Sequence, residues 1–198
     1  MRDLNFLQGF TLLFFAMLAG GCAIGGGASA GLLVDTRGSI GVMASVRGFP
    51  WGMRQSDTAE GHEAALGMMP LEVGGGYDFN PKAATLHVRI PGMGYTFDNI
   101  DDEWGLQTSL NAVFDMKWPV EGEFKGAFGA GLATAWLPHL DHAVLPRHPN
   151  RPEWPDPHRI HRLGPGLSVN VLYDDEGVYG QFFLGAVYDV IEYFTIGL

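Results

Sequence analysis

The sequence predicts an all-β fold: an eight-stranded antiparallel up-and-down β-barrel with a short helix in its first long loop. Three observations support this prediction. Long stretches alternate apolar and polar residues, which is the pattern of a strand with two different faces. Short turns rich in Gly, Pro, Asn or Asp join some of these stretches, and longer connections join the others. The 198 residues are enough for one domain or one small closed barrel.

Composition and charge exclude some classes of function. Charged residues make up 17% of the chain, compared with about 25% in soluble domains. So few charges would cover a large water-facing surface poorly. The net charge is -10 and the isoelectric point is near 5.0, with no cluster of Lys and Arg, so nucleic acid is not expected as a partner.

The first residues have the pattern of an export signal. The apolar run from Phe10 to Leu18 is too short to cross a bilayer as a helix, and small residues follow it. The segment Leu18-Ala19-Gly20-Gly21-Cys22 resembles the lipobox of bacterial lipoproteins, which implies covalent lipid on Cys22, the single cysteine. An ordinary secretory signal is the alternative. The expected parts are a signal peptide (1–21), lipidated Cys22 with a flexible tether (22–30) and a barrel domain (31–198).

One expected strand and one expected loop precede residue 71. Residues 31–47 keep the same alternation throughout, which a single long strand explains. A tight turn at Arg37-Gly38, giving two strands, is the alternative. Residues 49–70 form a long connection in which Asp57-Thr58-Ala59-Glu60 resembles a capping box. We therefore expect a short helix in this loop, extending through Met69.

The clearest alternation runs from Trp104 to Trp136 and predicts two long strands joined by a turn at residues 119–122. Tryptophans bracket the apolar face, as in the aromatic belts found at membrane interfaces. The opposite face carries small or polar residues. The aromatic residues expected to face the membrane are Trp104, Phe114, Trp118, Phe124, Phe128 and Trp136.

The remaining strands follow the same pattern. They are expected over residues 71–79, 83–90, 166–174 and 178–198. The last segment is too long for one membrane strand of about ten residues, so we divide it near Tyr188-Asp189; one undivided strand is the alternative. The division gives eight strands, with both termini at the end of the barrel that carries the short turns.

This order of strands and connections resembles small outer-membrane barrels of the OmpA type over residues 31–198. The resemblance implies a location in a bacterial outer membrane, with membrane lipid as a partner. It also implies a structural or surface-interaction role through the long loops at residues 49–70, 91–103 and 137–162. A soluble, lipid-anchored, lipocalin-like barrel that binds a small apolar ligand is the second hypothesis. A lipid-modifying barrel enzyme is the third.

In a membrane barrel, the polar and small faces of the strands would point into the lumen. Buried charges need partners, and both signs are present on these faces, so the sequence predicts a plugged interior without an open pore. The residues expected in this lumen network are Asp35, Arg37, Arg47, Glu72, His87, Arg89, Asp115, Lys117, Glu123 and Lys125.

Candidates for chemistry are few. Four histidines of the 137–162 loop, His139, His142, His158 and His161, could gather a zinc or copper ion from different turns. A solvated loop is the alternative, since their spacing is irregular. An enzyme would need His87 or His62 within hydrogen-bond reach of a Ser or Asp facing the membrane. No catalytic residue is assigned, and no cofactor is expected besides the lipid on Cys22.

Overall fold

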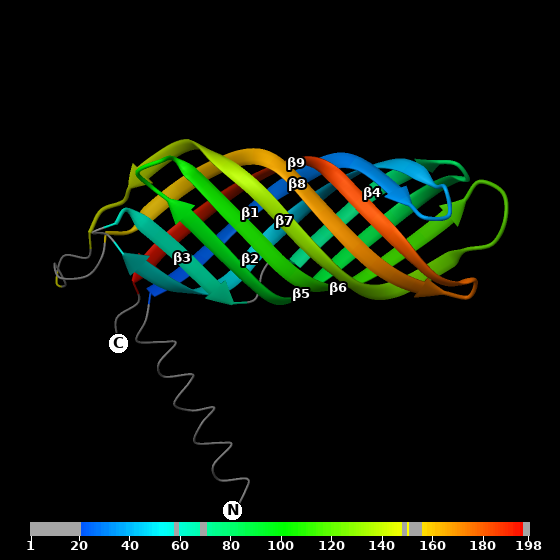
Figure 1. Cartoon of the computed structure of the whole chain (residues 1–198), viewed down its shortest axis with the longest axis horizontal. Coiled ribbons are helices and arrows are strands. Elements are labelled where there is room, and N and C mark those ends of the chain that lie inside the picture. Colours follow the sequence, from blue (N-terminus) through cyan, green and yellow to red (C-terminus); the bar gives the residue numbers. More distant parts are fainter. Residues whose placement is uncertain (1–20, 58–59, 68–70, 148–149, 151–155, 196–198) are drawn as a thin grey trace, which may run out of the picture.

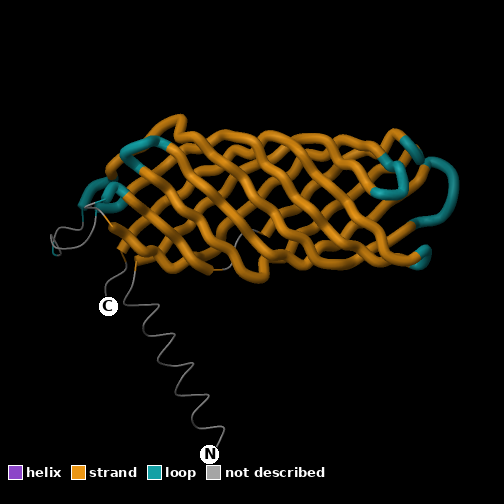
Figure 2. Tube along the Cα trace, viewed as in Figure 1, coloured by secondary structure: helices purple, strands orange, loops and turns teal. Residues whose placement is uncertain are grey.

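The computed structural model describes residues 21–57, 60–67, 71–147, 150 and 156–195, which form a long barrel of antiparallel strands (Figure 1). The loops and turns among the described residues lie at its two ends (Figure 2). The strands are β1 (Gly21–Asp35), β2 (Ile40–Asp57), β3 (His62–Gly67), β4 (Leu71–Phe79), β5 (Lys82–Asn99), β6 (Trp104–Pro119), β7 (Lys125–Val144), β8 (His158–Asp174) and β9 (Gly177–Thr195).

The nine strands occupy eight positions in the wall. Strand β3 pairs with residues 53–57 of β2, and β4 pairs with residues 41–48 of the same strand. Both also pair with β5, so β3 and β4 share one position. Strand β1 pairs with β2 on one side and with β9 on the other, which closes the barrel. The predicted closed, eight-stranded antiparallel barrel is therefore confirmed.

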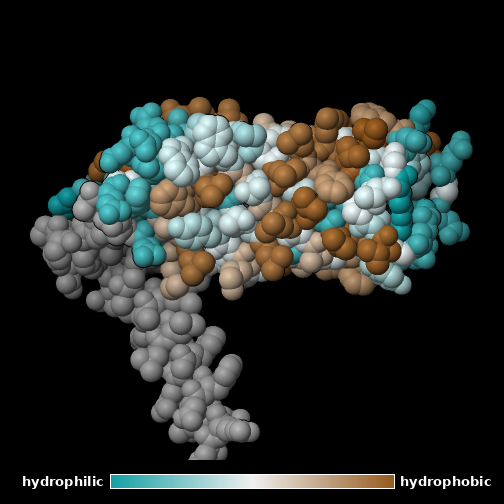
Figure 3. All heavy atoms as spheres, viewed as in Figure 1, coloured by the Kyte–Doolittle hydropathy of each residue, from teal (hydrophilic) through white to brown (hydrophobic). Residues whose placement is uncertain are grey.

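The faces of the wall are inverted relative to a soluble protein. Along β6 and β8, buried and exposed residues alternate almost without a break. The exposed positions are mostly apolar; for example, Leu110, Phe128 and Leu132 are 56%, 58% and 55% exposed. In Figure 3, hydrophobic residues gather over the middle of the barrel, and hydrophilic residues gather at both ends.

Small residues on the inner face allow neighbouring backbones and side chains to approach closely. A Cβ atom on Gly129 would lie 1.9 Å from the carbonyl oxygen of Val171, and one on Gly31 would lie 2.3 Å from that of Leu184. A side chain at either position would force the backbone to shift. This explains why one face of β7 is so rich in Gly and Ala.

The predicted helix in the first long loop is wrong, because the described residues contain no helix. Strand β2 continues to Asp57, and residues 62–67 form β3. The inward-facing Glu63 is bonded to Arg54 of β2, and this buried pair holds the segment in the sheet. The stabilisation that the sheet gains from this buried ion pair outweighs the local preference of the capping-box sequence for a helix. No described helix is long and apolar enough to cross a bilayer.

The prediction of one strand over residues 31–47 is also wrong, and the turn at Arg37-Gly38 is present. Gly38 has a φ of 89°, and the Asp35 carboxylate accepts hydrogen bonds from the N–H groups of Arg37 and Ser39. Hairpins of this kind place glycine in the left-handed region. Val34 pairs with Ile40, so the alternation keeps its parity across the turn. The pattern therefore did not reveal the break.

The division near Tyr188-Asp189 is wrong as well, because β9 is a single strand that pairs with β8 along its length. Asp189 is fully buried and faces Arg162 across the β8–β9 pair, so it belongs to the interior and not to a turn. The missed turn and the extra division offset each other. The predicted number of positions in the wall, eight, was therefore correct, although the structure has nine strands and two predicted boundaries were wrong.

The connections differ from those predicted. Strands β5, β7 and β8 extend into the expected loops, which leaves residues 100–103 and 145–157 between strands. The first residue of β1, Gly21, pairs with the last residue of β9, Thr195, at the end of the barrel that carries these connections (Figure 1). This end lies opposite the short turns, so the prediction that both termini lie at the short turns is wrong. Strand β1 also includes residues 22–30, where Cys22 and a flexible tether were expected. Residues 1–20 of the expected signal lie outside the described residues.

Candidate functional site

The barrel interior collects the charged and polar groups of the chain. Inward positions on all strands contribute to it because their neighbours along the strand face outward. Three ionic layers follow one another along the barrel, and each contains cations and carboxylates in contact. The first layer lies at the end with the short turns, and the third lies toward the end with residues 100–103 and 145–157.

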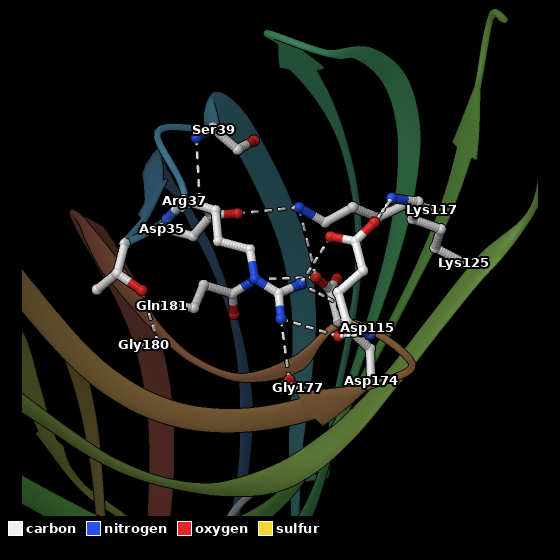
Figure 4. A network of polar contacts seen from close by, with 12 residues as sticks. Asp35, Arg37, Ser39, Asp115, Lys117, Lys125, Asp174, Gly177, Gly180 and Gln181 are labelled. Carbon is white, nitrogen blue, oxygen red and sulfur yellow. Dashed lines mark hydrogen bonds and ion pairs between the residues drawn. The ribbon is translucent and has the colours of Figure 1, made fainter. Parts of the chain in front are cut away.

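The first layer, the mouth, lies at the short turns (Figure 4). Arg37 donates to both carboxylate oxygens of Asp174, at 2.5 and 2.9 Å, and its guanidinium stacks over the Tyr179 ring at 4.3 Å. The Asp174 carboxylate raises the pKa of Arg37 further, so this residue stays charged. Lys117 donates to Asp78 at 2.7 Å. A cavity of about 220 Å³ is lined by Arg37, Asp174 and Lys117, among others.

The second layer is centred on the buried Glu72. Its carboxylate accepts hydrogen bonds from Ser45 at 2.5 Å and from Arg89 at 2.8 Å. Arg89 also donates to Ser168 of the opposite wall at 2.5 Å, which bridges the lumen. The cavity at this level measures only about 20 Å³, which is room for about one water molecule.

The third layer is centred on Asp98 and Arg162, both fully buried. Arg162 donates to both oxygens of Asp98 at 3.0 Å and lies 3.5 Å from Asp189. His139 Nε2 and the Tyr193 hydroxyl also contact Asp98, at 3.0 and 2.6 Å. The carboxylate is therefore surrounded by donors, as a buried charge requires.

A chain of amides and an imidazole lies between the mouth and the second layer. Asn170 donates to Gln181, and Gln181 donates to Asp115 Oδ2 at 2.9 Å. His87 is fully buried, and its Nδ1 lies 3.7 Å from Asp115 Oδ1, beyond hydrogen-bond distance. Neither ring nitrogen of His87 has a hydrogen-bond partner among the described residues. Buried polar groups of this kind usually bind water.

Most residues of the predicted lumen network lie in the interior. Arg47 contacts Asp189 at 3.4 Å and donates to Gln107. Lys125 lies at the exposed rim of the mouth, bonded to Glu176. The exception is Glu123, which is exposed in the turn between β6 and β7, so its assignment to the lumen is wrong. This turn extends past the barrel wall, where the strand parity no longer applies.

The sequence failed to identify several interior charges. Asp98 and Arg162 were assigned to loops, and Asp189 was assigned to a turn. Each of them occupies an inward position of a strand that is longer than predicted. The sequence did contain a signal for these positions, because Asp98 and Arg162 alternate with apolar neighbours such as Phe97 and Leu163. The other interior charges that were not identified are Arg54, Glu63, Asp78 and Asp174.

The four histidines considered as metal ligands enter different contacts. His139 binds Asp98, and His161 Nδ1 lies 2.8 Å from the Tyr188 hydroxyl. His142 Nε2 and His158 Nδ1 lie 2.8 Å apart. Within the described ranges, no group of three or more His, Cys, Asp or Glu residues is arranged to hold a metal ion.

The loop between β7 and β8 is closed at its base. Leu145 N–H donates to the Pro157 carbonyl, and Arg147 binds the carboxylate of Asp156. The hydrogen bond from Arg147 lowers the pKa of Asp156 below its usual value. Arg54 also donates to the Asp156 carbonyl at 2.7 Å, which ties this loop to β2.

The geometry required for the enzyme hypothesis is not found at the two histidines that it named. His87 faces the interior and not the membrane, and its nearest carboxylate is beyond hydrogen-bond distance. His62 is partly exposed, lies 3.6 Å from Glu60 and packs against Phe97. The soluble hypothesis required the apolar faces to point inward, and the structure has the opposite orientation.

The aromatic residues expected on the outer face lie there. Phe114, Trp118, Phe124 and Trp136 are exposed, as is Phe128, whereas Trp104 is partly exposed and packs against Phe97. Trp118 also packs against Phe124 across the β6–β7 turn, with ring centroids 5.4 Å apart. The outer wall therefore combines aliphatic side chains with aromatic residues toward the ends of β6.

Comparisons with known proteins give one distant structural likeness. No family model matches the chain, and no curated protein matches it. Among solved structures, the β-domain of the Bordetella autotransporter BrkA is similar over 88% of this chain and 99% of that chain. The identity is 10% and the TM-score is 0.35. This likeness is too distant to assign the chain to a family.

Proposed function

We propose that this chain is a membrane-spanning barrel of a bacterial outer membrane, with a structural or interaction role and no open pore. The observation that carries the proposal is the inverted wall, with an apolar outside and an ionic inside. Monomeric soluble proteins rarely expose contiguous apolar patches larger than a few hundred Å². A ring of exposed Leu, Val and Phe side chains is stable only against an apolar solvent, and lipid provides one.

The filled interior supports an interaction role over transport. Arg89 bridges the lumen from Glu72 to Ser168, and the space that remains at this level holds about one water molecule. A solute could pass only if these buried ion pairs separated, which costs several kcal/mol per pair. The parts of the chain free to meet a partner are therefore those at the two ends.

We also propose that Cys22 carries lipid, with the lipobox-like segment as support. The backbone of Cys22 pairs with that of Phe194, at the end of the barrel that carries residues 145–157. A lipid in the periplasmic leaflet would direct this end, and its proline-rich loop, toward the periplasm. The short turns would then face outward. The partner of residues 145–157 would be a component of the cell envelope.

Expression of the full chain in a Gram-negative host tests this function. We expect the protein in the outer-membrane fraction, with different gel mobilities before and after boiling because the folded barrel resists detergent. Labelled fatty acid should attach to the wild type and not to the Cys22→Ser variant. That variant should still form a heat-modifiable barrel, because the wall does not depend on the lipid.

The outcomes of this experiment separate the two parts of the proposal. Recovery of folded wild-type protein in the soluble periplasmic fraction would contradict the membrane location. Equal labelling of wild type and Cys22→Ser would contradict the lipid site while leaving the barrel assignment intact.

A further inference from the structure

We propose that His142 and His158 form a proton-operated latch at the base of the loop between β7 and β8. The latch is closed while the two imidazoles share a hydrogen bond, and it opens when both rings are positively charged. The two ends of the loop, residues 145–147 and 156–157, then come apart. The inference does not depend on the membrane location or on lipid at Cys22, because all the contacts concerned lie within this end of the barrel.

The contact between the two rings joins the end of β7 to the start of β8. His142 Nε2 lies 2.8 Å from His158 Nδ1, with the ring centroids 4.9 Å apart. In a hydrogen bond of this kind, one nitrogen donates its hydrogen and the other accepts it with a lone pair. An imidazolium ring has no lone pair to offer, so the bond survives one added proton but not two. Two charged rings at this distance repel each other.

The carboxylate beside His158 is already neutralised. Glu63 Oε1 lies 3.6 Å from His158 Nε2, but Arg54 donates to both oxygens of Glu63, at 2.5 and 2.8 Å. Glu63 therefore offsets little of a second positive charge in the pair. The other titratable and charged groups that face the two rings are His139 and Asp141 of β7, Asp98 of β5, Glu103 before β6, Tyr193 of β9 and Asp156 of the loop.

These other carboxylates also give the pair little compensation. Asp98 is bonded to Arg162, and Asp156 is bonded to Arg147. Asp141 is exposed, as is Glu103, so water and salt screen both charges. Double protonation of the histidines therefore leaves an excess of positive charge at the base of the loop.

Both rings lie beyond Trp136, the aromatic residue at this edge of the apolar outer wall, toward the loop. Burial lowers the pKa of His142, and the nearby His139 lowers it further. Burial also lowers the pKa of His158, an effect that Glu63 opposes and His142 reinforces. A lowered pKa in the closed form means that this form loses stability as the pH falls below the ordinary histidine value of about 6.5. The latch is therefore closed at neutral pH and opens in mild acid.

The backbone hydrogen bond next to the pair is the one that opening would break first. Leu145 N–H donates to the Pro157 carbonyl at 2.8 Å, and Pro157 directly precedes His158. The pair of Arg147 and Asp156 also crosses the base, but both side chains are partly exposed and such pairs stabilise little. On the barrel side, the β7–β8 ladder continues, which confines the opening to the base of the loop.

Hydrogen exchange of backbone amides tests the latch. The folded full chain, in a non-ionic detergent, is compared at about pH 7.5 and about pH 5, with rates corrected for the intrinsic effect of pH. We expect protection of the Leu145 amide to fall about tenfold or more at the lower pH, because its bond to Pro157 opens locally. Protection of the Val113 amide in the middle of β6 should stay the same.

Three variants separate the latch from other effects of acid. His142→Gln can still bond to His158 but cannot gain charge, so the change at Leu145 should shrink to less than about twofold. His142→Lys is charged at both pH values, and should already give the low protection at neutral pH. His161→Gln is the matched control on β8, since His161 bonds to Tyr188 and not to the pair. It should keep the pH dependence of the wild type.

The proposal is overturned if Leu145 of the wild type is equally protected at both pH values. It is also overturned if His142→Gln loses as much protection as the wild type in acid, because another group would then carry the effect. An equal loss at Val113 would show that the whole barrel opens, which contradicts a local latch. None of these outcomes bears on the membrane assignment.

Discussion

Replacing Arg162 by methionine is expected to lower the free energy of unfolding by about 3–5 kcal/mol. The guanidinium is fully buried and contacts both Asp98 and Asp189, and its removal leaves two buried carboxylates without the cation that they share. Methionine fills part of the space but provides no charge. Urea unfolding of the barrel in detergent measures the change.

Arg159→Met is the matched control on the same strand. Arg159 lies on the outside near the start of β8 and binds Glu192, and both side chains are partly exposed. Such pairs contribute about 0–1 kcal/mol. Adding Asp98→Asn to Arg162→Met should recover part of the loss, because it removes one of the two buried carboxylates that have lost their shared cation. Equal destabilisation by the two arginine substitutions would contradict a closed, ionic interior.

Replacing Leu132 by arginine is expected to cost about 2–4 kcal/mol of folding free energy in a bilayer. Leu132 is exposed at the middle of β7, where it pairs with Leu110 on one side and Val169 on the other. In water, an arginine at so exposed a position would cost little. In lipid, its charge must be removed from water or must reach the interface.

Val120→Arg is the control for this prediction. Val120 is 69% exposed in the turn between β6 and β7, beyond the aromatic residues, so arginine there should cost about 0–1 kcal/mol. Folding into vesicles followed by denaturant titration gives both values. If Leu132→Arg and Val120→Arg have the same small effect, the outer wall is not in contact with lipid.

The fold could be predicted from sequence wherever the two faces of a strand differ chemically. Strands β6 and β7 are the best example, since apolar residues such as Leu110 and Phe128 alternate with Asn111 and Gly129. The alternation could not reveal the turn at Gly38, because paired residues on both sides keep the same parity. It also could not show that Asp57 continues a strand, since that depends on the buried pair of Arg54 and Glu63.

The composition of the interior could be predicted, but its contacts could not. The sequence shows the charge of Glu72, Arg89 and Asp115 and places each of them on the polar face of its strand. Which of them meet depends on the register between strands and on the tilt of the wall, which bring Arg89 to Ser168 across the lumen. Asp98 and Arg162 were missed because the strands that carry them extend past the expected membrane length.

Spin labelling of the outer wall tests the membrane assignment most directly. The chain has one cysteine, so a Cys22→Ser background accepts single labels at Phe128, Leu132 and Val120. In vesicles, labels at Phe128 and Leu132 should collide often with oxygen and rarely with a water-soluble nickel complex. The label at Val120 should show the reverse. A label at Leu132 that meets the nickel complex as readily as one at Val120 would place the outer wall in water and contradict the assignment.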